Sequence, residues 1–200
     1  MRVCKYTPPV VGLDMSLTGT AAVAFPAGWD RATKDVRSMT VGTPLVKATG
    51  AQKIERIFNI VTAVVDFVRE SGRPCKVSGG VSAMPAVFIE GYAYSARSAS
   101  VTQLAELGGA VRYALLRDLG IIAREVPASS ARLYLLGKLP RGKGTQKPAA
   151  VAGVRACGFE FGTVDEFDAW VITNFGLAEV GGVGFSLAAM GDRSPATPVT

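Results

Sequence analysis

Residues 9–25 read PVVGLDMSLTGTAAVAF and contain two short apolar runs that are rich in valine. The stretch 16–19, Ser-Leu-Thr-Gly, separates these runs, and this pattern predicts a β-hairpin with a polar turn. A third strand is expected near residues 36–41. The front of the chain therefore predicts an antiparallel meander of three strands.

Behind the meander, apolar residues recur at helical spacing in two long segments, 51–70 and 98–119. Further strands are expected at 86–90 and 121–126, and shorter helices at 127–137, 148–156 and 163–181. This order predicts an α/β fold with a mixed five-stranded sheet, antiparallel at the front and parallel at the back. We expect helices on both faces of that sheet.

The length of 200 residues and the apolar fraction of 48% suit one globular domain with a sizeable core. We expect this domain to occupy residues 1–181. Glycine, proline, serine and threonine dominate residues 182–200, which are expected to form a flexible C-terminal tail.

The chain has a net charge of +6 and no histidine. A basic balance favours polyanionic partners such as nucleic acid or anionic membranes. The three cysteines are widely spaced, so neither a zinc site nor a disulfide framework is indicated. We identify no signal peptide and no transmembrane segment, and a cytoplasmic protein that does not enter the membrane is expected.

Four acidic residues stand where apolar segments begin or end. Asp14 and Glu90 close two predicted strands, whereas Asp165 and Asp168 lie three residues apart near the start of the last helix and share one face. Such a cluster repels itself unless cations are present. Mg²⁺ prefers oxygen ligands, and two ions about 3.5–4 Å apart can hydrolyse a phosphodiester. The pattern therefore predicts a metal site that meets a polyanion, as in a metal-dependent nuclease.

Each carboxylate also has a purely structural interpretation. Asp14 could cap a turn with Ser16 and Thr18, and Glu90 could be a solvated strand end. Thr163 and Glu166 fit a capping box, and in that setting Asp165 would favour the helix dipole. Asp168 adjoins an apolar run and has no capping role. The four residues taken together favour the metal site.

The chain resembles the RuvC-type Holliday junction resolvases of the ribonuclease H-like superfamily. The resemblance extends from Val10 to about Ala178. The motifs that carry it are Gly-Leu-Asp-Met-Ser at 12–16, Phe-Ile-Glu at 88–90, Leu-Ala-Glu-Leu-Gly-Gly-Ala at 104–110 and Asp-Glu-Phe-Asp-Ala at 165–169. Each motif is weak alone, but their order and spacing are specific.

The resemblance implies a homodimer that cuts two strands of a four-way DNA junction symmetrically, with Mg²⁺ or Mn²⁺ as cofactor and two ions per active site. It implies that the catalytic metal ligands are Asp14, Glu90, Asp165 and Asp168. It also implies that water attacks the phosphorus without a covalent intermediate, and that Arg132 and Lys147 lie near the cleaved strand. Since the chain has no histidine, a histidine-assisted variant of the mechanism is excluded.

Family members often place an aromatic residue after the strand-end glutamate, where it stacks at the junction. Here Ala93 falls near that place, so either Tyr92 or Tyr94 could stack on a base, or either could pack in the core. The loop 137–147 contributes further basic residues that either contact phosphates or are simply solvated. These residues are Lys138, Arg141, Lys143 and Lys147.

Three alternatives remain open from the sequence. The first is a nuclease with a broader preference for flaps and forks, since catalytic residues alone do not fix substrate shape. The second is an actin-like ATP-binding module, because residues 12–19 are similar to a phosphate-binding turn, although 200 residues are too few for its duplicated domain. The third is a DNA-binding scaffold without activity, which the retained acidic set argues against. The sequence does not identify a partner helicase.

Overall fold

The computed structural model describes residues 7–29, 35–42, 49–73, 83–91, 99–142 and 144–187. Its elements are, in chain order, β1 (Val10–Asp14), β2 (Thr20–Phe25), β3 (Arg37–Val41), α1 (Gly50–Ser71), β4 (Ala86–Glu90), α2 (Ala99–Leu119), β5 (Arg124–Val126), α3 (Ala128–Leu136), α4 (Gln146–Ala156) and α5 (Val164–Glu179).

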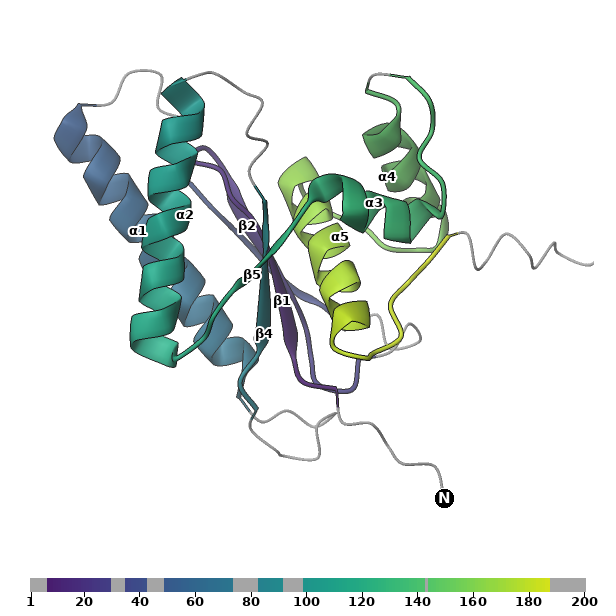
Figure 1. Cartoon of the computed structure of the whole chain (residues 1–200), viewed down its shortest axis with the longest axis horizontal. Coiled ribbons are helices and arrows are strands. Elements are labelled where there is room, and N and C mark those ends of the chain that lie inside the picture. The colour runs from purple at the N-terminus through teal and green to yellow at the C-terminus, as the bar shows by residue number, and fades with distance from the viewer. Residues whose placement is uncertain are drawn as a thin grey trace, which may run out of the picture.

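The five strands form one sheet in the order β3-β2-β1-β4-β5. The pairs β1–β2 and β2–β3 are antiparallel, and the pairs β1–β4 and β4–β5 are parallel. The expected mixed five-stranded sheet is therefore confirmed. Figure 1 shows α1 and α2 on one side of this sheet and α3, α4 and α5 on the other, so the expected helices on both faces are confirmed as well.

The central strand β1 packs directly on α5. A Cβ atom added to Gly12 would lie 2.5 Å from the backbone nitrogen of Thr173 and 2.6 Å from the carbonyl oxygen of Ala169. The buried Thr173 hydroxyl donates to the carbonyls of Ala169 at 2.7 Å and Val23 at 3.0 Å. Because a side chain at position 12 would separate the two elements, glycine sets how closely the helix approaches the sheet.

The opposite face is covered by α1 and α2. Thr49 begins α1 with a complete capping box, in which its hydroxyl accepts from the Gln52 backbone and the Gln52 side chain accepts from the Thr49 backbone. Val64 and Val68 of α1 and Leu115 of α2 are fully buried. The helix expected at 51–70 is therefore present. Its apolar stripe is buried at Val64, Val65 and Val68, whereas Ile54 and Phe58 of the same stripe remain exposed.

The last strand is shorter than the sequence suggests. We expected a strand at 121–126, but β5 begins at Arg124. Gly120 has a φ of 68°, and the nitrogens of Gly120 and Ile121 donate to the carbonyls of Leu116 and Leu115. This arrangement ends α2 in the manner of a Schellman motif, so Ile121 closes the helix instead of pairing in the sheet.

Residues 182–187, which we expected to belong to the flexible tail, pack against the domain. Phe185 is buried, and its backbone makes two hydrogen bonds with the buried Asn174 side chain, at 2.5 and 2.8 Å. The Leu187 nitrogen donates to the Leu135 carbonyl. Phe185 and Leu187 supply the apolar surface with which this Gly-rich segment packs. Residues 188–200 lie outside the described residues, so the division into a domain and a tail stays a prediction.

Within the described ranges, no helix combines the length and the hydropathy needed to cross a membrane.

Candidate active site

Two of the predicted carboxylates meet at the end of the parallel strand pair. Leu13 of β1 is paired with Ile89 of β4, so the residues that follow, Asp14 and Glu90, end neighbouring strands at the same edge of the sheet. Their side chains share a hydrogen bond. The sequence-based expectation that these two strand ends lie side by side is therefore correct.

Among the acidic residues that the structure describes, Asp14 has the pKa that is raised farthest from its ordinary value. The pKa of Asp14 is raised from 3.8 to about 9, first by burial and then by the hydrogen bond to Glu90. The negative charges of Glu90, Asp168 and Asp165 add to this effect. Because each of these carboxylates disfavours a charge on Asp14, the other three all lie within electrostatic reach of Asp14.

The start of α5 places Asp165 beside the β1–β2 turn. Thr163 caps this helix, and its hydroxyl accepts from the Glu166 nitrogen at 3.1 Å. The Glu166 carboxylate accepts from the Gly162 nitrogen at 2.8 Å, one residue before the position that a capping box requires. A Cβ atom on Gly19 would lie 2.8 Å from Oδ2 of Asp165. Half of the predicted capping box is thus present, and Asp165 faces the turn that follows β1.

The turn itself is held by its own hydroxyl groups. Thr20 Oγ1 donates to the Ser16 carbonyl at 2.5 Å and accepts from the Ser16 nitrogen at 3.1 Å. The hydroxyls of Ser16 and Thr18 are 2.9 Å apart. Since these groups close the turn and Asp14 faces Glu90, the interpretation of Asp14 as a turn cap is not supported.

Asp168 lies deeper and is bound by two cations. This carboxylate is buried, and its Oδ1 accepts from the guanidinium of Arg132 on α3 at 3.2 Å. Its Oδ2 accepts from the ammonium of Lys147 on α4. The two basic residues that we expected near the cleaved strand are thus brought together by the fold, both against the same carboxylate.

The donor set fits a hard divalent cation in its chemistry. All four side chains offer carboxylate oxygens, the ligands that Mg²⁺ and Mn²⁺ accept, and their mutual repulsion is visible in the raised pKa of Asp14. Within the parts of the chain that the structure describes, however, no three acidic or cysteine side chains converge closely enough to hold an ion as they stand. Both oxygens of Asp168 are in contact with Arg132 and Lys147.

The remaining predicted DNA contacts are only partly covered by the structure. Lys138 and Arg141 are exposed in the connection between α3 and α4, where a basic loop was expected. Tyr92, Tyr94 and Lys143 lie outside the described residues. Their roles stay predictions.

The structure adds one carboxylate near this edge that the sequence did not single out. Glu125 of β5 is paired with Ile89 of β4, and its Oε1 lies 2.5 Å from the guanidinium of Arg112. A Cβ atom on Gly91 would lie 3.9 Å from its other oxygen. Because the segment 121–126 was interpreted only as a strand of the sheet, Glu125 gave no functional signal.

No protein-family model matches the sequence, and no curated protein matches it. Solved structures do match the fold. One is the Thermus thermophilus RuvC in complex with a Holliday junction substrate, with a TM-score of 0.58 and 14% sequence identity, covering 88% of this chain and 98% of that one. Another is a Thermus thermophilus RuvC structure, with a TM-score of 0.56 and 15% identity over the same shares of the two chains.

These identities are low, so the likeness concerns the fold. Nearly the whole length of the RuvC chains is matched. The resemblance that the motifs around Asp14, Glu90 and Asp168 suggested is therefore confirmed at the level of architecture: this chain has the RuvC-type, ribonuclease H-like fold.

Proposed function

We propose that this protein is a metal-dependent, structure-selective DNA endonuclease that resolves four-way junctions by phosphodiester hydrolysis. The observation that carries the proposal is that Asp14 and Glu90 end neighbouring parallel strands, with Asp165 and Asp168 of α5 within electrostatic reach of Asp14. The RuvC-type fold and the net charge of +6 support the same conclusion.

In this proposal Asp14 and Glu90 hold the metal from adjacent strand ends, and Asp165 and Asp168 complete the ligand set from α5. Bound Mg²⁺ or Mn²⁺, with two ions per site, supplies the activation of water and the stabilisation of the leaving oxygen. The close packing of Gly12 on α5 keeps the strand ends and the helix start in register. Arg132 and Lys147 lie next to the acidic set and bind the phosphates of the strand that is cut.

The basic residues outside the ion pairs extend the same surface. Lys138 and Arg141 are exposed and, with Lys143, would bind the DNA backbone in a salt-dependent manner. We assign base stacking at the junction to Tyr92 or Tyr94, as the resemblance implies.

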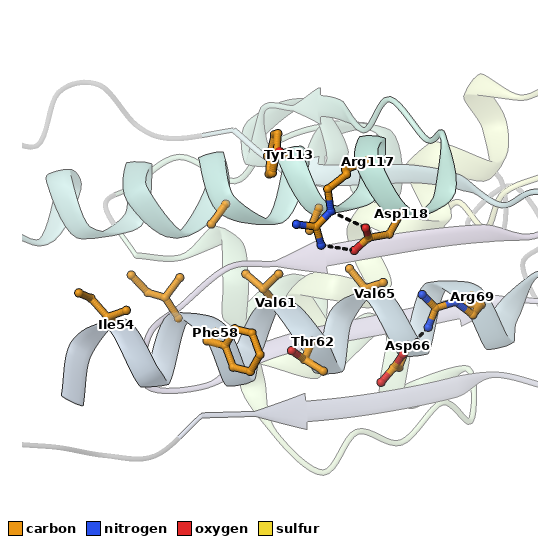
Figure 2. A pocket seen from close by; sticks show the side chains of 13 residues that line it. Ile54, Phe58, Val61, Thr62, Val65, Asp66, Arg69, Tyr113, Arg117 and Asp118 are labelled. Carbon is orange, nitrogen blue, oxygen red and sulfur yellow. Dashed lines mark hydrogen bonds and ion pairs between the residues drawn. The ribbon is translucent and has the colours of Figure 1, made fainter. Parts of the chain in front are cut away.

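Symmetric cleavage needs two active sites, and we propose that a second copy of the chain supplies the other one. The groove between α1 and α2 offers the surface for it (Figure 2). Ile54, Phe58 and Tyr113 line this groove and are each more than 60% exposed. Figure 1 places α1 and α2 on the side of the sheet away from α5, so that a partner docked here leaves the acidic site accessible.

The charges of this groove favour a copy of the same chain over DNA. Each helix contributes one acid–base pair, Asp66 with Arg69 on α1 and Arg117 with Asp118 on α2. The lining is therefore neutral overall, which gives no attraction for phosphate. Under a twofold rotation, however, acidic and basic groups of one copy can face their opposites in the other.

The oligomeric state tests this part of the proposal. Phe58→Ser should shift the protein from dimer to monomer in sedimentation analysis at micromolar concentration, because it removes an apolar side chain from the centre of the groove. Ile122→Ser is the matched control, since Ile122 is 79% exposed and is not part of the groove lining. A wild-type monomer, or equal effects of the two variants, would contradict the groove as the dimer surface.

Cleavage of a synthetic four-way junction tests the activity. With Mg²⁺ or Mn²⁺ the protein should cut two strands symmetrically, and a chelator should stop the reaction. Asp14→Asn should abolish cleavage while junction binding persists, whereas Glu55→Gln, which removes an exposed carboxylate of α1 outside the groove lining, should retain cleavage. If Asp14→Asn cuts at the wild-type rate, the assignment fails.

Initial rates on junction, fork, flap and linear duplex then define the substrate. A clear preference for the four-way junction supports a resolvase. Similar rates on forks and flaps would instead indicate a branched-DNA nuclease with a broader preference.

A further inference from the structure

The buried carboxylate Asp168 already has a cation on each of its oxygens. Oδ1 accepts from Arg132 at 3.2 Å, and Oδ2 accepts from Lys147. Only 9% of the Asp168 side chain is exposed, so water has little access to it. In this arrangement each oxygen of Asp168 accepts a hydrogen bond from a cation, and both cations are ion-paired with this one carboxylate.

The two cations are more accessible than the carboxylate that they hold. The side chains of Arg132 and Lys147 are 21% and 36% exposed, and they come from α3 and α4, the two helices that flank the basic connection with Lys138 and Arg141. A phosphate that approaches this surface can therefore reach the ammonium and guanidinium groups, while Asp168 stays beneath them.

Phosphate and carboxylate compete for the same donors. Arginine binds phosphate through parallel N–H bonds, and lysine binds it as a point charge, so both residues have a strong alternative partner once DNA is present. When one cation turns to a phosphate, the buried Asp168 keeps only the other cation, and its negative charge is less well compensated. A divalent cation near Asp14 and Glu90 would then be the nearest means of compensation.

We propose that Lys147 and Arg132 form a latch that keeps Asp168 from binding metal, and that the DNA backbone releases it, so that metal loading is coupled to DNA binding. This inference rests on the proposed nuclease function. Coupling of this kind is reciprocal: if bound DNA strengthens metal binding by some factor, bound metal strengthens DNA binding equally. The latch would keep the acidic site closed to metal until a phosphate backbone is in place.

Metal affinity without DNA tests the latch. In Mn²⁺ titrations followed by electron paramagnetic resonance, Lys147→Gln should bind Mn²⁺ about tenfold more tightly than wild type, within the usual range of coupling between sites. Lys147→Arg keeps a cation and should match wild type. Lys138→Gln makes the same change of charge at an exposed residue and controls for a general electrostatic effect.

If Lys147→Gln does not fold, Arg132→Gln carries the test, because it removes the other contact to Asp168. Mn²⁺ affinity in the folded variants that is unchanged or weaker than wild type, or that rises equally in Lys138→Gln, would overturn the latch.

Release by DNA is tested in the presence of a chelator, where the proposed cleavage cannot occur. The side-chain nitrogen resonance of Lys147, assigned by its loss in Lys147→Arg, should shift when a four-way junction is added, while binding is followed by fluorescence anisotropy. A bound junction that leaves this resonance unchanged would overturn the release step. Absence of both junction binding and cleavage would overturn the proposed function and the release step, whereas the Mn²⁺ titration decides the latch independently.

Discussion

The two sides of the sheet are built differently. On the α5 side, helix and strand backbones are in contact at Gly12, and ten residues of α5 are buried. On the side of α1 and α2, the core beneath the helices is also buried, but Ile54 and Phe58 remain about two-thirds exposed. The α5 side therefore has little freedom to move, which is what a set of closely spaced carboxylates requires. The other side has apolar surface to offer a partner.

The largest expected difference between the two sides concerns pH. Without metal, the folded protein retains a proton on Asp14 up to a pKa of about 9, whereas the unfolded chain loses it near 3.8. The folded state thus binds more protons at Asp14 in this range, so the contribution of Asp14 to stability is greatest below pH 4 and is lost as the pH rises toward 9. We expect a slope of the order of 1 kcal/mol per pH unit in denaturant titrations with chelator.

Asp14→Asn should flatten this slope and make the metal-free protein more stable than wild type at pH 8. Asp66→Asn removes one carboxylate on the opposite side of the sheet and should leave the slope in place. Equal slopes in wild type and Asp14→Asn would show that Asp14 does not carry the buried proton.

The next prediction concerns the contact between β1 and α5. Gly12→Ala should destabilise the protein by about 3 kcal/mol, because the added carbon meets backbone atoms that cannot rotate away. Gly109→Ala on α2 is the matched control: nothing lies within 4 Å of its added carbon, so the higher helix propensity of alanine should raise stability by about 0.5–1 kcal/mol. Denaturant midpoints measure both, and similar losses in the two variants would remove the distinction between the faces.

A smaller effect is expected where the end of the described chain is held to α5. Asn174→Ala removes the two hydrogen bonds to the Phe185 backbone and leaves buried polar groups unsatisfied, which should lower stability by about 2 kcal/mol. Amide exchange at Phe185 should increase in the same variant. If exchange there is unchanged, the Asn174 side chain does not anchor this segment.

The smallest effect is expected at the exposed end of α1. Ile54→Ser should change the stability of the monomer by less than about 0.5 kcal/mol, since the side chain is 71% exposed. Thermal unfolding at a protein concentration low enough to prevent association measures this value. A loss as large as that of Asn174→Ala would mean that Ile54 belongs to the core of the single chain.

Much of the fold follows from local pattern. The alternation of apolar runs and polar turns over residues 9–25 predicts the hairpin, and the apolar spacing of 51–70 predicts α1 because both signals act over a few residues. The error at 121–123 has a physical cause. An apolar segment after a glycine can pair in a sheet or close the preceding helix, and the contact of Ile121 with the end of α2 decided between the two.

In the candidate site, too, some features follow from local sequence and others only from the tertiary structure. The sequence alone determined that Asp14 and Glu90 end strands and that Asp165 and Asp168 share one helix face, since those properties depend on neighbouring residues. Only the tertiary structure decided that Gly12 brings α5 against β1, that Asp14 faces Glu90, and that Arg132 and Lys147 meet at Asp168. Arg132 and Lys147 lie 36 and 21 positions from Asp168 in the sequence, and the other contacts join residues still farther apart. All of them depend on how whole elements pack, which no local pattern specifies.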